Sequence, residues 1–228
     1  MPHEETDGWN VMEFSPVSYI DHMGSDDAVC DAARVSFNKT SSNYTDDQNS
    51  RLLNFLAEHD HWSPFAHCFV KFKFRAPMFV ARQFQKHVVG FSWNEVSRRY
   101  VSDRPWFYIP TAWRKRPDSM KQGSSIDGQI PVKGDIKNEY IDNMRHHAKD
   151  YDSLIKENVC PEQARMLMPQ AMQTEWIWTG SLMSWMRFVR LRKDSHTQLE
   201  SQAYAYEVED HLKKLFPNSV AAFTRGIN

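Results

Sequence analysis

The segment from Cys68 to Arg75 constrains the fold most, because apolar and basic side chains alternate along it. From position 70 onward the even positions are apolar and the odd positions basic: Val70, Phe72 and Phe74 against Lys71, Lys73 and Arg75. A period of two is typical of a strand that turns one face to a hydrophobic core and the other toward solvent. The chain must therefore build a sheet whose apolar face is covered by other elements.

Helical spacing of apolar residues surrounds this strand. It predicts helices over residues 26–37, 46–59, 136–155, 181–192 and 197–216, and Pro77 stands where it can open another. Further strands are predicted over residues 17–20 and 170–179. Because strands and helices follow one another without a regular βαβ rhythm, we expect an α+β fold, with a mixed or antiparallel sheet packed with several helices.

The length of 228 residues and the 41% hydrophobic content suit one domain over residues 1–228. No internal repeat or low-complexity tract divides the chain. Residues 113–134 are polar and rich in Pro and Gly, so they are expected to form a mobile surface loop.

Charge and hydropathy exclude several classes of protein. A net charge of −1 does not favour a general nucleic-acid binder, which would be clearly basic. No apolar run approaches the roughly 18 residues of a membrane span, and the acidic first ten residues do not resemble a signal peptide. The three scattered cysteines predict reduced thiols in the cytoplasm.

Several common chemical motifs are missing from the sequence. It contains no Gly-x-Gly-x-x-Gly turn, no phosphate loop and no Gly-x-Ser-x-Gly elbow, and it has 8 glycines in all. His59, His61 and His67 are too loosely spaced to predict a zinc site, so no metal is expected.

Residues 82–100 carry an unusual density of polar and charged side chains, interleaved with Phe84, Phe91, Trp93 and Tyr100. One interpretation is a solvated turn that follows a helix. The other is a ligand site, because polar groups held among aromatic rings need partners and a nucleotide would supply them.

The second half of this segment resembles the signature of flavin-dependent thymidylate synthases, Arg-His-Arg-x-x-Ser-x-Asn-Glu-x-Ser-x-Arg-Tyr. It reads Ser92-x-Asn94-Glu95-x-Ser97-x-Arg99-Tyr100. The first half departs from the signature: the triplet is Lys86-His87-Val88, and one extra residue follows before Ser92. We expect Gly90 to absorb that extra residue.

Four other stretches resemble the same family in the same order. They are Ala32–Ser36, His61–His67, Ala164-Arg165 with Pro169 and Trp178, and Leu191–Glu200. The resemblance covers roughly residues 30–216, apart from the 113–134 loop. Ser181 and Met183 stand where the family often has Asn and Arg, so Arg187 or Arg190 would have to compensate.

The resemblance implies a homotetramer that converts dUMP to dTMP with FAD, methylenetetrahydrofolate and NADPH. It implies a flavin site formed by His61, Ser63, Lys86, His87, Asn94, Glu95, Arg187 and His196. It implies a dUMP site formed by Gln83, Glu95, Ser97, Arg98, Arg99, Arg165 and Arg192. The residues implied in the chemistry are Glu95, Ser97 and Arg192.

Two alternatives stay open at this point. The departures are compatible with a relative that hydroxymethylates a pyrimidine nucleotide or modifies deoxycytidylate. They are also compatible with an inactive protein that binds flavin or nucleotide. For Arg98, ordinary surface charge is an equal alternative to nucleotide binding.

Overall fold

The computed structural model describes residues 5–6, 9–12, 14, 16–116, 129–130 and 134–225. The chain forms two compact units, each assembled from three separate stretches. The first unit comprises Met1–Pro16, Phe74–Lys86 and Asn94–Trp176, and the second comprises Val17–Lys73, His87–Trp93 and Ile177–Asn228. That residues 1–228 act as one catalytic domain stays a prediction.

The main sheet has four strands, hydrogen-bonded in the order β3, β4, β9, β5. Their bounds are Ser18–Met23, Phe69–Pro77, Gln173–Ser181 and Phe91–Glu95, respectively. β3 and β4 run antiparallel, with Ser18 opposite Lys73. The alternation predicted for β4 is confirmed, because Val70, Phe72 and Phe74 are fully buried while the basic side chains between them keep contact with solvent. The α+β class is confirmed as well.

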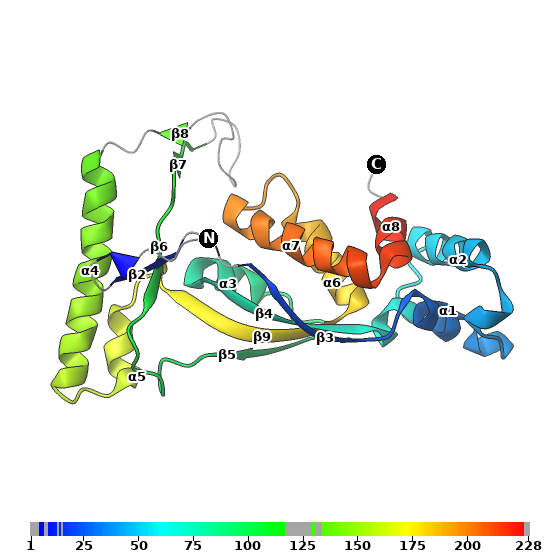
Figure 1. Cartoon of the computed structure of the whole chain (residues 1–228), viewed down its shortest axis with the longest axis horizontal. Coiled ribbons are helices and arrows are strands. Elements are labelled where there is room, and N and C mark those ends of the chain that lie inside the picture. The colour runs from blue at the N-terminus through cyan, green and yellow to red at the C-terminus, as the bar shows by residue number, and fades with distance from the viewer. Residues whose placement is uncertain are drawn as a thin grey trace. The chain divides into compact units, whose positions relative to one another are not determined.

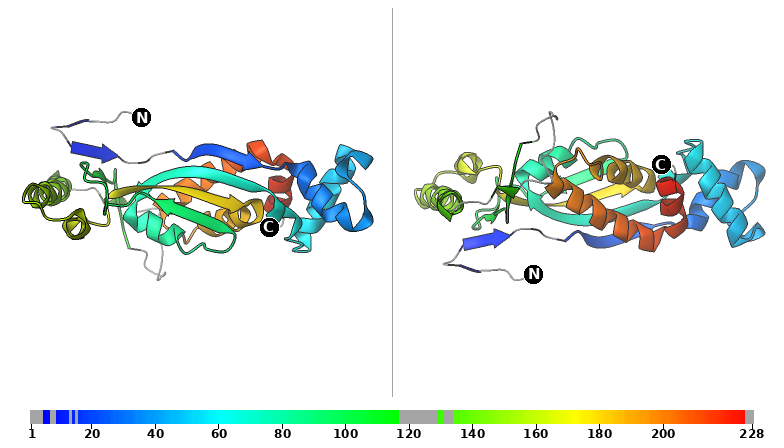
Figure 2. Two further views of the ribbon diagram at one scale, coloured as in Figure 1. Left: turned by 90° about the horizontal axis from the view of Figure 1, so that it is seen from below. Right: turned by 90° about the horizontal axis from the view of Figure 1, so that it is seen from above.

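In the second unit, helices α6 (Leu182–Arg192) and α7 (Leu199–Leu215) lie on one face of the sheet (Figure 1). The two views of Figure 2 show the strands in front from below and these helices in front from above. Trp185 of α6 donates its indole N–H to the carbonyl of Val70, 3.0 Å away, and packs edge-on against Phe72. Apolar burial against β4 therefore fixes α6 on the sheet.

Three more helices complete the second unit: α1 (Asp26–Arg34), α2 (Asp46–Glu58) and α8 (Pro217–Arg225). Short 3-10 turns cover Val35–Phe37, Ser41–Asn43 and Pro64–His67. Two carboxylates of this unit find partners within it. Buried Glu209 accepts from both Lys193 and Lys213 at 2.8 Å, and Asp26 accepts from the backbone N–H of Ser219 at 2.9 Å.

The first unit contains α3 (Met78–Phe84), α4 (Gly134–Lys156) and α5 (Pro161–Ala164), with a 3-10 turn over Arg165–Leu167. β2 (Trp9–Met12) pairs antiparallel with β1 (Glu5–Thr6) and parallel with β6 (Trp106–Tyr108). The side of α4 that carries Met144 and Ala148 forms a core with Phe107, Ala171 and Met172.

The predicted helices and strands agree with the structure to within a few residues, whereas β1, β2, β5, β6, α5 and α8 were not predicted. In the segment predicted as a loop, β7 (Trp113–Arg114) pairs with β8 (Gln129–Ile130). The rest of that prediction falls on residues 117–128 and 131–133, which lie outside the described residues. Within the described part, no helix is long and apolar enough to cross a membrane.

Candidate functional site

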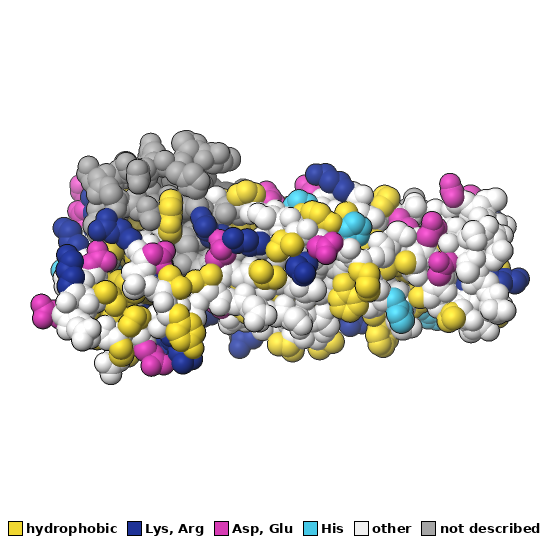
Figure 3. Space-filling view, turned by 60° about the horizontal axis from the view of Figure 1, so that its bottom comes forward, with side chains coloured by type: hydrophobic (Ala, Val, Ile, Leu, Met, Phe, Trp, Pro, Cys, Tyr) yellow, Lys and Arg dark blue, Asp and Glu magenta, His cyan; other side chains and the backbone are white. Residues whose placement is uncertain are grey.

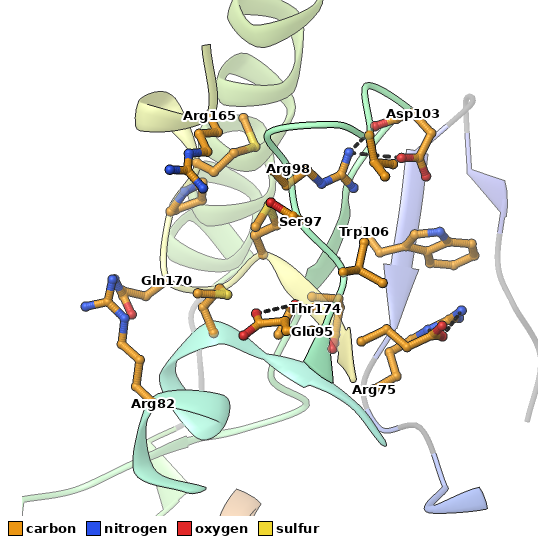
Figure 4. Close-up of a pocket in the computed structure, with 18 of the residues that line it drawn as sticks. Arg75, Arg82, Glu95, Ser97, Arg98, Asp103, Trp106, Arg165, Gln170 and Thr174 are labelled. Atoms are coloured by element: carbon orange, nitrogen blue, oxygen red, sulfur yellow. Dashed lines mark hydrogen bonds and ion pairs between the residues drawn. The ribbon is translucent and has the colours of Figure 1, made fainter. Parts of the chain in front are cut away.

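A cavity of about 700 Å³ lies in the first unit and contains four of the predicted substrate residues (Figure 4). Its wall is made by the ends of β4, β5 and β9, the loop after β5, and residues 165–170. The predicted residues in the wall are Glu95, Ser97, Arg98 and Arg165. A volume of this size is typical of sites for small molecules, which occupy roughly 300–1,000 Å³.

Glu95, the last residue of β5, is held in a single orientation. One of its carboxylate oxygens accepts from the Thr174 hydroxyl at 2.6 Å, and the other accepts from the Gln85 side-chain amide at 2.9 Å. The carboxylate group is therefore oriented before any ligand arrives.

A tight turn follows β5 and places Ser97 and Arg98 in the cavity wall. The carbonyl of Ser97 accepts from the backbone N–H groups of Tyr100 and Val101, at 3.0 and 3.2 Å. Arg98 donates to the backbone carbonyl of Asp103 and to its carboxylate, the latter at 3.1 Å. Arg98 thus braces this loop at the same time as it lines the cavity.

Glu162 of α5 joins two candidate phosphate ligands. Its carboxylate pairs with Arg99 Nε at 3.0 Å, and its backbone carbonyl accepts from Arg165 Nε at 3.3 Å. Arg165 lines the cavity, whereas Arg99 lies outside the lining that the described residues form. Gln83, another predicted substrate residue, donates to the Phe79 carbonyl on its own helix at 3.4 Å.

Gln173 is a feature of the cavity wall that the sequence did not single out. It is 6% exposed, and neither the oxygen nor the nitrogen of its amide has a hydrogen-bond partner within the described residues. A buried amide without a partner costs roughly 1–3 kcal/mol. The sequence did offer one signal for this residue. Gln173 is a polar residue within the predicted strand 170–179, which also contains Trp176 and Trp178.

In the second unit, the structure brings together two predicted site residues that are 105 positions apart in the chain. Arg192 Nε donates to His87 Nε2 at 2.9 Å. The imidazole ring packs edge-on against Phe188 and Trp178, with centroids 5.1 and 6.3 Å away. Burial, assisted by the charge of Arg192, lowers the pKa of His87 to about 4, so the ring is neutral at physiological pH.

The loop that follows His87 is anchored to the start of α6. The Val89 carbonyl accepts from Ser184 Oγ at 2.9 Å, and the Gly90 carbonyl accepts from the Ser181 backbone N–H at 3.1 Å. Gly90 has φ = +73°, as expected for the residue that absorbs the extra position, and a Cβ there would collide with Ser184 Oγ.

The other predicted flavin residues occupy separate local environments. His61 packs edge-on against Phe55, and His196 Nδ1 lies 2.8 Å from the carboxylate of Asp194. The remaining ones are exposed: Ser63, Lys86, Asn94 and Arg187. An ammonium, a guanidinium, an amide and a hydroxyl fit the acceptors of FAD, which are its pyrophosphate and its ring carbonyls.

Comparison with known proteins identifies the family. The sequence profile of the thymidylate synthase complementing protein family, Thy1, matches residues 18–218. The flavin-dependent thymidylate synthase of Thermosipho africanus is 36% identical over 220 residues, which cover 95% of this chain and 94% of that protein. The enzyme of the same name from Kosmotoga olearia is 34% identical over 213 residues, which cover 93% of this chain and 91% of that protein.

A solved structure agrees with this assignment. The crystal structure of the UMP/dUMP methylase PolB from Streptomyces cacaoi, bound with 5-Br dUMP, superposes with a TM-score of 0.82 at 27% identity. The superposition covers 94% of this chain and 97% of PolB. Profile, relatives and fold lead to one conclusion: this chain belongs to the Thy1 family, the family of the flavin-dependent thymidylate synthases.

Proposed function

We propose that this protein is a thymidylate synthase that methylates dUMP to dTMP. Methylenetetrahydrofolate supplies the one-carbon unit, FAD is the cofactor and NADPH is the reductant. The observation that carries this proposal is the cavity in which Ser97, Arg98 and Arg165 surround an oriented Glu95. An anionic nucleotide with a hydroxylated sugar matches that combination of donors and acceptors.

The cationic side of the cavity suits the phosphate group. Arg165 presents a planar guanidinium, and Ser97 adds a hydroxyl, so both donate to phosphate oxygens. Arg99 stands beside Arg165 because both bind Glu162, and it adds positive charge near the same position. Arg98 is already engaged with Asp103, so its main contribution is to hold the loop.

The centre of the cavity suits the sugar. Glu95 presents its carboxylate to the cavity, and carboxylate oxygens accept hydrogen bonds from sugar hydroxyls. Because Thr174 and Gln85 fix the carboxylate, the sugar binds without first ordering this side chain.

Within the described residues, Arg192 is not part of the cavity lining, and its role at the pyrimidine is the one that the family resemblance implies. Its guanidinium donates to the ring carbonyls and stabilises the negative charge that develops there when C5 becomes nucleophilic. When bound, FAD supplies the hydride chemistry, and the residues that would hold it are Lys86, Asn94, Arg187 and His61.

No cysteine is needed as a nucleophile. Cys30 and Cys68 are buried free thiols, and burial raises the pKa of each to about 11, which makes them poor nucleophiles. Within the described residues, the cavity wall contains no cysteine. Free thiols also agree with our proposal of a cytoplasmic location.

Assembly into a homotetramer is part of the proposal. All six residues of edge strand β3 are exposed, and three of them are the large apolar side chains Tyr19, Ile20 and Met23. On the face drawn in Figure 3, apolar side chains are interspersed with charged ones. Exposed apolar side chains on an edge strand favour association. Light scattering should give four times 26.8 kDa, and a stable monomer that still turns over dUMP would exclude shared sites.

The decisive experiment is turnover of dUMP with methylenetetrahydrofolate and NADPH by the flavin-loaded enzyme. We expect dTMP together with tetrahydrofolate, since the folate does not supply the hydride. Parallel reactions with UMP and dCMP distinguish other pyrimidine specificities, and analysis of the product distinguishes a methyl from a hydroxymethyl group. If NADPH bleaches the flavin but no nucleotide is modified, the proposal fails in favour of a binding protein.

A further inference from the structure

The contact between Arg192 and His87 has a defined direction. Arg192 Nε carries a hydrogen, so His87 Nε2 must accept it, and the imidazole proton must be on Nδ1. Only a neutral imidazole can accept in this way. The guanidinium plane is thereby tied through Nε, the atom nearest the side-chain stem.

His87 itself is held by contacts with α6 as well as with Trp178 of β9. The loop that follows it binds the first turn of α6 through Ser181 and Ser184. Its ring packs on Phe188, which precedes Arg192 by four residues and therefore lies on the same face of α6. The helix that carries Arg192 thus also positions the acceptor of Arg192.

We propose that His87 is a positioning residue for Arg192: it fixes the guanidinium so that its terminal N–H groups meet the pyrimidine of the nucleotide in a set orientation. This inference rests on the proposed function, in which Arg192 binds the pyrimidine. It gives His87 a role other than the direct flavin contact that the resemblance implies.

The physical basis is preorganisation. An arginine side chain has several rotatable bonds, and ordering it on ligand binding carries an entropic cost. A guanidinium whose Nε is already bonded has lost most of that freedom before the nucleotide arrives. The ring remains a competent acceptor at neutral pH because its pKa lies far below 7.

Two substitutions separate hydrogen bonding from packing. In His87→Gln the side-chain oxygen can still accept from Arg192 Nε, whereas His87→Leu fills similar space without an acceptor. The matched control is Val89→Ala, because Val89 is 75% exposed and contributes only its carbonyl to the loop anchor. Each variant is assayed as the flavin-loaded full chain for dUMP affinity, inorganic phosphate affinity, kcat, KM and bound flavin.

We expect His87→Leu to weaken dUMP binding and to lower kcat by about tenfold each, since one charge-assisted contact is misplaced. His87→Gln should recover most of both losses, and Val89→Ala should match the wild type. Phosphate affinity and flavin content should be unchanged in all three. If His87→Leu instead loses flavin at unchanged dUMP affinity, or if Gln rescues nothing in a folded protein, the inference is overturned.

A double-mutant cycle with Arg192→Lys tests the link directly, because lysine has no Nε–H group at that position. His87→Leu should add little to dUMP affinity in the Arg192→Lys background, and additive losses would refute positioning. The same cycle measured on the thermal midpoint reports the hydrogen bond without any nucleotide. If the wild type fails to bind dUMP, the proposed function fails, and the thermal cycle still decides whether His87 holds Arg192.

Discussion

The His87–Arg192 pair of the second unit and the Gln173 amide in the cavity wall of the first unit differ in whether their hydrogen-bonding groups are satisfied. At the pair, a cation and a neutral ring satisfy each other among aromatic side chains. In the cavity wall, the Gln173 amide is buried without a partner in the described structure. The pair is therefore ordered by contacts within the protein. The cavity wall, in contrast, contains an amide whose hydrogen-bonding groups the surrounding described residues do not satisfy.

The largest expected effect is at Arg192, in the second unit. Arg192→Ala should lower kcat by about 10²–10³-fold, the range for loss of one donor to a developing oxyanion. Steady-state kinetics with dUMP checks this, with Arg51→Ala as the control, because Arg51 is an exposed arginine of α2 that has no role in either site. A loss below tenfold would remove Arg192 from the chemistry.

Arg165 should behave differently, because it meets the phosphate group rather than the reacting ring. Arg165→Ala should weaken dUMP binding by about 1.5–3 kcal/mol, roughly ten- to a hundredfold, with a smaller change in kcat. Calorimetry with dUMP and with deoxyuridine separates the two ends of the nucleotide. Equal losses for both ligands would place Arg165 away from the phosphate. Arg99→Ala should follow the same pattern with a smaller loss, since Arg99 lies outside the cavity lining.

The pair should make stability depend on pH. The pKa of His87 is about 4 in the folded protein and about 6.5 when unfolded, so below pH 6.5 the unfolded chain binds a proton that the folded chain refuses. Stability is therefore lost as the pH falls from about 6.5 to 4, by about 2 kcal/mol after allowance for the partly exposed ring. Urea unfolding at several pH values should show a flatter profile for His87→Gln. An identical slope in both proteins would contradict the half-buried, neutral imidazole.

The smallest expected effects come from removing one polar group in each region. Gln173→Met should stabilise the ligand-free protein by about 1 kcal/mol, because a buried amide without a partner is replaced by an apolar side chain of similar size. Ser184→Ala should destabilise it by about 1 kcal/mol, because the Val89 carbonyl loses its donor. Thermal melts of both variants test the contrast, and shifts of the same sign would abolish it.

Local patterns were predictable where side chains alone decide the structure. The alternation in β4 identified its buried face, and the motif over residues 92–100 located Glu95, Ser97 and Arg98, which line the cavity. The strand β5 was missed because its density of polar groups resembles a turn. The structure shows that Phe91 and Trp93 pack on Trp178, which keeps this segment extended.

Contacts between distant segments were not predictable. The Thr174 hydroxyl reaches Glu95 across 79 positions of sequence, and Arg192 reaches His87 across 105. Both depend on strand order and on the path of a loop, which residue spacing does not report. For the same reason, the sequence could not predict that the Gln173 amide lacks a partner in the described structure. The lack of a partner depends on every residue that surrounds the amide in the cavity wall.

The anchored loop after His87 sets rules for anyone who redesigns this protein. Position 90 accepts no side chain, because its left-handed backbone and Ser184 together exclude one. Positions 88 and 89 are 69% and 75% exposed, so they can be varied widely at little cost in packing. A designer who wishes to graft the missing arginine of the family triplet can therefore place it at position 88 directly, and a library that randomises the loop should leave position 90 untouched.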